Sequence, residues 1–106
     1  MPLNALNSVA RRAVLACLAL FVAPASAMDG AQMVMDYGCI NCHASQSHTA
    51  PTLKRLADRM ARDRDRPEAV QAMLREIRGQ SGIHTHQMVP DEAALAILQW
   101  LAQGGK

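Results

Sequence analysis

The sequence has few aromatic residues, few cysteines and no strand-like pattern. Its 106 residues include one Phe, one Tyr, one Trp and three Cys. Two of the cysteines are only two residues apart and cannot cross-link distant segments, so a disulfide framework is excluded. No alternating run of β-branched residues and no Asn-Gly hairpin signal is present, which argues against a sheet-based fold. The length allows one domain and excludes a multidomain enzyme.

Acidic residues are absent from positions 1–27, where Arg11 and Arg12 are the only charged residues. An apolar run over 13–22 follows, and the segment closes on small residues that end at Ala27. This pattern predicts a secretory signal cleaved after Ala27, and therefore a periplasmic chain. The apolar run is shorter than the roughly 20 residues that span a bilayer, so membrane anchoring is not expected. An uncleaved signal, or a lipid on Cys17, is the less favoured alternative.

A strong net charge is also lacking. The predicted mature domain, residues 28–106, has nine basic and nine acidic side chains. This balance argues against nucleic-acid binding, which usually needs a strongly basic domain. A basic run over 54–66 is interpreted as a solvated helix face with internal ion pairs, and the alternative is a docking patch for an acidic partner. No nucleophile–base pair or carboxylate pair stands out, so an enzyme with a small-molecule substrate is not predicted.

Helical periodicity dominates the predicted mature chain. Apolar residues at i, i+3, i+4 and i+7 predict three helices, which include residues 53–60, 70–77 and 94–101. A shorter helix is expected over Ala31–Tyr37. Pro67 and Pro90 suit helix starts and Gly79 suits a helix end. Residues 44–51 and 80–89 are expected to be loops, so the prediction is an all-α fold of four helices.

One motif carries chemistry: Cys39-Ile-Asn-Cys42-His43, the attachment pattern of c-type haem. Two thiols one turn apart can bond the two vinyl groups of the porphyrin, and His43 can supply an axial nitrogen. A thioredoxin-like pair would need a βαβ context, and a zinc site would need further ligands with metal-like spacing. The motif, the export signal and the absence of other cysteines after residue 27 together predict one covalent haem and its iron.

The motif and its surroundings resemble the small bacterial monohaem class I cytochromes c. The stretch Gly38–His43 resembles the attachment site at the end of that family's N-terminal helix. Ala50-Pro51 resembles a Gly-Pro step whose proline carbonyl accepts a hydrogen bond from the proximal histidine. The resemblance therefore implies that Pro51 orients His43.

The C-terminal half carries the rest of the resemblance. The stretch Gly79–Ile83 resembles a glycine-rich turn, and Met88-Val-Pro90 resembles the methionine loop of the family. Trp100 stands at the aromatic position of a C-terminal helix that crosses the N-terminal one. The resemblance implies a four-helix cytochrome c fold wrapped around one haem.

The sixth iron ligand has two kinds of candidate. Met88 lies in the predicted 80–89 loop and is the expected axial ligand, whose soft thioether would raise the reduction potential. His84 and His86 lie in the same loop and are the competing ligands, which would give a bis-histidine site of lower potential. The methionines on predicted helices are interpreted as packing residues: Met33, Met35, Met60 and Met73.

These observations predict a periplasmic electron carrier rather than an enzyme. With both axial positions filled, the iron would exchange single electrons by outer-sphere transfer with periplasmic or membrane-bound redox proteins. One alternative is a tightly bound haem subunit of a periplasmic dehydrogenase or oxidase. Another is a haem-based sensor with a labile distal ligand.

Overall fold

The computed structural model describes residues 28–106, and this part of the chain contains helices and no strand. The predicted all-α class is therefore confirmed for these residues. The elements in chain order are α2 (Gly30–Asp36), α3 (Ile40–His43), α4 (Leu53–Met60), the 3₁₀ helix η2 (Ala61–Asp63), α5 (Pro67–Gly79), α6 (His84–Met88) and α7 (Asp91–Ala102). The predicted secretory signal and its cleavage site lie outside the described residues.

The four main helices follow the predicted periodicity. The helix expected over Ala31–Tyr37 is α2, and the three periodic segments lie on α4, α5 and α7. Pro67 opens α5 and Gly79 is its last residue, as expected. The loop predicted at 44–51 is confirmed.

The prediction that residues 80–89 form only a loop is wrong. The five-residue helix α6 occupies the second half of this segment. Its last turn is closed by a 3.1 Å hydrogen bond from Val89 N to the Thr85 carbonyl. Short helices have little intrinsic stability, so contacts from elsewhere in the fold decide whether such a turn forms. Those contacts come from Arg78 on α5, whose side chain binds backbone carbonyls of this turn.

Side-chain caps fix where two of the helices begin. The Asp29 carboxylate accepts a 3.0 Å hydrogen bond from Ala31 N at the start of α2. The Thr52 hydroxyl accepts a 3.1 Å bond from Arg55 N at the start of α4. Such caps satisfy backbone donors that have no partner inside the helix, at about 1 kcal/mol each. The two capped helix starts lie before and after the cysteine motif in the chain.

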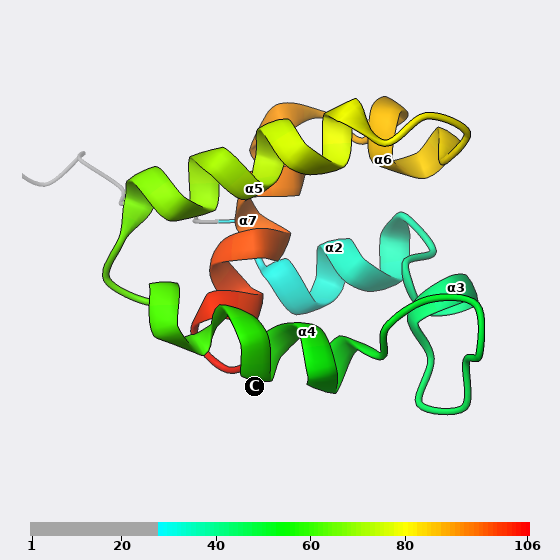
Figure 1. Ribbon diagram of the computed structural model, residues 1–106, viewed down its shortest axis with the longest axis horizontal. Coiled ribbons are helices and arrows are strands. Elements are labelled where there is room, and N and C mark those ends of the chain that lie inside the picture. The colour runs from blue at the N-terminus through cyan, green and yellow to red at the C-terminus, as the bar shows by residue number, and fades with distance from the viewer. Residues whose placement is uncertain (1–27) are drawn as a thin grey trace, which may run out of the picture.

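The central element is α7, which packs against α2, α4 and α5 (Figure 1). It buries six residues, whereas α2 buries Gly30 and Val34 and the other two helices bury two residues each. Small side chains let the neighbours approach closely. The buried residues of α7 are Ala93, Ala94, Ile97, Leu98, Leu101 and Ala102.

The closest approach between α2 and α7 occurs at Gly30. A Cβ atom on Gly30 would lie 2.3 Å from Trp100 Cβ and 2.5 Å from the Ala96 carbonyl oxygen. Both distances are far below van der Waals contact, so only glycine fits at this position. The backbones of α2 and α7 therefore approach each other closely at Gly30.

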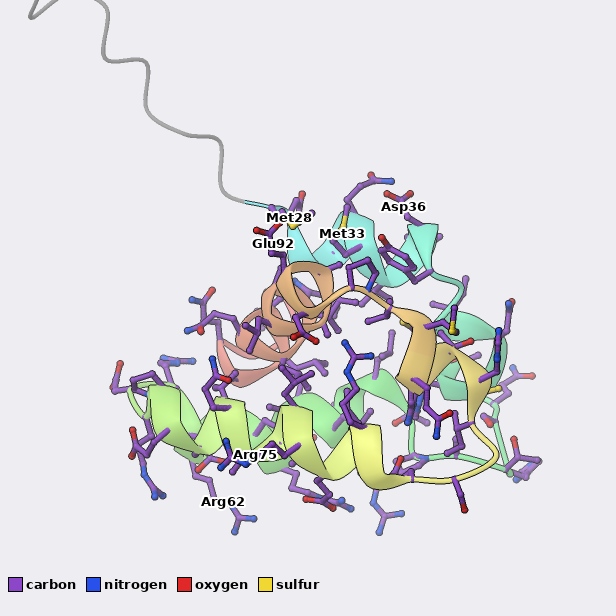
Figure 2. The ribbon with its side chains drawn as sticks, turned by 90° about the horizontal axis from the view of Figure 1, so that it is seen from above. Met28, Met33, Asp36, Arg62, Arg75 and Glu92 are labelled. Atoms are coloured by element: carbon purple, nitrogen blue, oxygen red, sulfur yellow. The ribbon has the colours of Figure 1, made fainter. Side chains whose placement is uncertain are left out.

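The charged run over 54–66 carries internal ion pairs, as predicted. Lys54 pairs with Asp58 at 2.5 Å, and Arg66 pairs with Asp63 at 3.5 Å. The first pair is solvent-exposed on both sides, and Arg62 points away from the molecule (Figure 2). Exposed pairs of this kind stabilise a fold by only about 0–1 kcal/mol. Within residues 28–106, the helices are all too short or too polar to cross a membrane.

Candidate functional site

The end of α2 places the cysteine motif. Gly38 has a φ of +66°, in the left-handed region that favours glycine. Around it, Cys39 N donates to the Val34 carbonyl and Gly38 N donates to the Met35 carbonyl, both at 3.0 Å. This pair of hydrogen bonds is the Schellman motif, which ends one helix and redirects the chain. The first cysteine of the motif is therefore anchored directly to the last turn of α2.

The motif itself forms one helical turn. His43 N donates to the Cys39 carbonyl at 3.0 Å, and Cys42 N donates to the same oxygen at 3.3 Å. Residues three and four apart on a turn lie on one side, so the two thiols and the imidazole share a face. Both cysteines are free thiols, with Cys39 half-buried and Cys42 exposed. Burial raises the pKa of the Cys39 thiol above its ordinary value.

The imidazole of His43 is held by Pro51, as the resemblance implies. His43 Nδ1 lies 2.5 Å from the Pro51 carbonyl oxygen. A carbonyl can only accept, so Nδ1 carries a proton, and in the neutral ring Nε2 keeps its lone pair. An imidazole fixed in this way is oriented and charged correctly to bind a metal through Nε2.

A second imidazole lies beside the first. Both figures place α3 and α6 at the same end of the molecule (Figures 1 and 2). The rings of His43 and His86 are parallel within 3°, with their centroids 6.1 Å apart. His86 Nδ1 donates a hydrogen bond to Gln80 Oε1 at 2.8 Å. Burial lowers the pKa of His86, and the nearby charges of His43 and Arg78 lower it further.

Arg78 fastens α6 to the end of α5. Its guanidinium donates to the His86 carbonyl at 2.7 Å and to the Val89 carbonyl. It also pairs with Asp91 at 2.7 Å. The side chain is three-quarters buried, with 24% of its surface exposed. One arginine therefore links α5, the turn that carries His86 and the first residue of α7.

The other predicted ligands are placed less tightly. Met88 is the last residue of α6 and is 64% exposed. His84 and His48 are exposed, and neither side chain makes a hydrogen bond within residues 28–106. Sequence reasoning named His86 as a competing ligand but missed the roles of Gln80 and Arg78. No spacing signal could have found these two, because their partners are set by the fold.

Comparison with protein-family models, with curated proteins and with solved structures gives no match. The donor set of the motif consists of the thiols of Cys39 and Cys42 and the imidazole of His43. In the described part of the chain, no three His, Cys, Asp or Glu side chains converge as a metal-binding group. Two thiols and one imidazole on a single turn instead match covalent attachment of a porphyrin whose iron takes one protein nitrogen on that side.

Apolar surface near the motif fits the same group. The described chain exposes five large hydrophobic side chains on the segments 35–40 and 83–88, which carry or adjoin the motif and α6. Exposed apolar side chains that lie close together mark surfaces where proteins bind apolar groups. A flat hydrophobic macrocycle held by the motif is suited to cover those that face it. The five exposed side chains are Met35, Tyr37, Ile40, Ile83 and Met88.

Proposed function

We propose that this chain is a small monohaem c-type cytochrome that carries single electrons between redox proteins in the periplasm. The observation that supports it most strongly is the single turn Cys39–His43, with its imidazole fixed by Pro51. The thiols and the free Nε2 are the three attachment points that a covalently bound haem requires. The packing of α2, α4 and α5 on α7 is consistent with a small cytochrome c fold.

Each part of the site has a role in this proposal. Cys39 and Cys42 would hold the porphyrin through their sulfur atoms, and His43 would bind the iron through Nε2. Haem supplies one-electron chemistry between ferrous and ferric iron when it is bound. Pro51 keeps the His43 ring in one tautomer and one orientation. A second iron ligand would come from α6, which carries both Met88, the ligand predicted from the sequence, and His86.

The first test is whether the protein carries covalent haem. The full chain is produced in a bacterial host with cytochrome c maturation, and the purified protein is examined by absorption and by mass. We expect one haem that survives denaturation and acid–acetone extraction, and a low-spin spectrum that changes on reduction. Protein without covalent haem would overturn the proposal and return Cys39 and Cys42 to zinc or thiol chemistry.

Two variants sharpen this test. His43→Ala removes the proposed proximal ligand, and His48→Ala removes an exposed loop histidine nearby. We expect His43→Ala to lose the low-spin spectrum and His48→Ala to keep it. Migration of the loaded protein as a monomer supports a free carrier. Copurification with a large dehydrogenase or oxidase would instead favour the subunit alternative.

A further inference from the structure

We infer that His86 is the second axial ligand of the haem iron, opposite His43, and that Met88 is not a ligand. This inference rests on the proposed function. It concerns only what binds the iron on the side of α6. Three features of the described residues support it: the separation of the two rings, the hydrogen bonds that hold them, and the register of α6.

The separation of the rings matches that of two imidazoles on one metal ion. With metal–nitrogen bonds of about 2 Å, imidazoles on opposite sides of one ion have centroids about 6 Å apart. The rings of His43 and His86 are stacked, parallel within 3°, and their centroids are 6.1 Å apart. The fold therefore brings a second imidazole to the distance at which one iron can bind both.

The hydrogen bonds of the two rings are alike. In each ring Nδ1 donates to an oxygen, which is the Pro51 carbonyl for His43 and Gln80 Oε1 for His86. Within residues 28–106, neither Nε2 has a hydrogen-bond partner. Metal-binding histidines are usually held in this way, with one nitrogen bonded to an oxygen and the other facing the metal. Gln80 thus does for His86 what Pro51 does for His43.

The register of α6 separates His86 from the other candidates. Residues two apart on a helix point to different sides, whereas residues four apart share a side. Because the His86 ring lies beside His43, the opposite side of α6 carries His84 and Met88. Arg78 binds the backbone oxygen of His86 itself and so keeps this register in place. Met88, at 64% exposure, has no comparable support.

A bis-histidine iron differs from a histidine–methionine iron in measurable ways. Methionine ligation favours ferrous iron and raises the potential, so replacing it by imidazole lowers the potential. The oxidised form of a bis-histidine site also lacks the weak long-wavelength band that arises from methionine sulfur and ferric iron. These readouts do not depend on any partner or on electron-transfer activity.

The test begins with the unaltered, haem-loaded protein. We expect a low-spin oxidised spectrum without the methionine band and a low-spin ferric electron paramagnetic resonance signal of the bis-imidazole type. The presence of the methionine band would overturn the inference while leaving the proposed function intact. Failure to attach haem at all would overturn both, so the two failures are distinguishable.

Matched variants of α6 complete the test. His86→Ala should convert the ferric iron to high spin and allow rapid carbon monoxide binding to the reduced protein. Met88→Leu and His84→Ala should leave the spectrum and the potential unchanged. If His86→Ala does not accumulate, His86→Met provides the second measurement, because it should create the methionine band and raise the potential. A low-spin His86→Ala protein, or a Met88→Leu protein that turns high-spin, would overturn the inference.

Discussion

At the scale of single residues, Gly30 sets how closely α2 can approach α7. Its position leaves no room for a Cβ atom against Trp100 and the Ala96 carbonyl. Backbone atoms cannot move aside without moving a whole helix, so the clash cannot be relieved by a rotamer change. The glycine therefore determines the contact between α2 and α7.

We expect Gly30→Ala to lower the free energy of unfolding by about 1–3 kcal/mol, as overpacking of a core usually does. The control is Gly79→Ala at the end of α5, where an added Cβ would meet nothing within 4 Å. That change should be neutral or stabilising by up to about 1 kcal/mol, because alanine favours a helix. Urea unfolding of the haem-free protein measures both. Equal midpoints for the two variants would contradict this packing.

The two thiols of the motif should differ in reactivity before haem is attached. Only the thiolate reacts with iodoacetamide, and burial both shields Cys39 and raises its pKa. We therefore expect Cys42 to be alkylated first in the reduced, haem-free protein at about pH 8. Brief treatment followed by peptide mass analysis measures the order. In strong denaturant the two rates should converge, and a faster reaction at Cys39 in the folded protein would contradict the structure.

At the scale of elements, α6 depends on its attachment to α5. A five-residue helix is too short to be stable alone, and Arg78 supplies hydrogen bonds to two of the carbonyls at its C-terminal end. A second tie runs from Gln87 Nε2 to the Gln80 carbonyl at 3.3 Å. The segment that faces the cysteine motif is thus positioned by contacts outside its own sequence.

We expect Arg78→Met to cost about 1–3 kcal/mol in unfolding free energy, because it removes hydrogen bonds from a charged donor to partly buried carbonyls. Amide exchange over residues 84–89 should speed up more than exchange in α2. Arg75→Met is the matched control, since Arg75 is exposed on the same helix and its side chain makes no hydrogen bond within residues 28–106. Equal exchange rates in the two variants would show that Arg78 does not hold α6.

At the scale of the whole molecule, the buried core is small. Among residues 28–106 it contains twelve buried hydrophobic residues, four of which are alanines. A domain of this length buries a modest share of its surface, so a bound group adds greatly to its stability. The apolar side chains left exposed near the motif are the surface on which such a group would act.

We expect covalent haem to raise the melting temperature by about 10 °C or more, since a shift of 1 kcal/mol is worth about 4–8 °C in a domain of this size. The comparison is between the loaded protein and the double variant Cys39→Ala, Cys42→Ala, followed by circular dichroism. The exposed variant His48→Ala serves as the control and should melt like the unaltered protein. Equal melting temperatures with and without haem would contradict the proposed role of the exposed apolar surface.

The sequence by itself determined the local features of this protein. Periodic apolar residues predicted α4, α5 and α7, because a helix that buries one face must repeat every three to four residues. Pro67 marked the start of α5, since proline needs no backbone donor there. The spacing of Cys39, Cys42 and His43 predicted haem attachment, because these residues lie within one turn of the chain. The hydrogen bond from His43 Nδ1 to the Pro51 carbonyl likewise joins two residues that only a short loop separates.

Only the tertiary structure decided the relations between distant segments. The pairing of His43 with His86 joins residues on separate elements, and no spacing rule connects them. The helix α6 was predicted as a loop because its five residues have no strong local preference, and Arg78 stabilises it from another helix. The close contact of Gly30 with Trp100 likewise depends on how two helices pack. Chemistry that depends on neighbouring residues can be predicted from the sequence. Packing brings together residues that are far apart in the chain, and their order in the sequence does not indicate the contact.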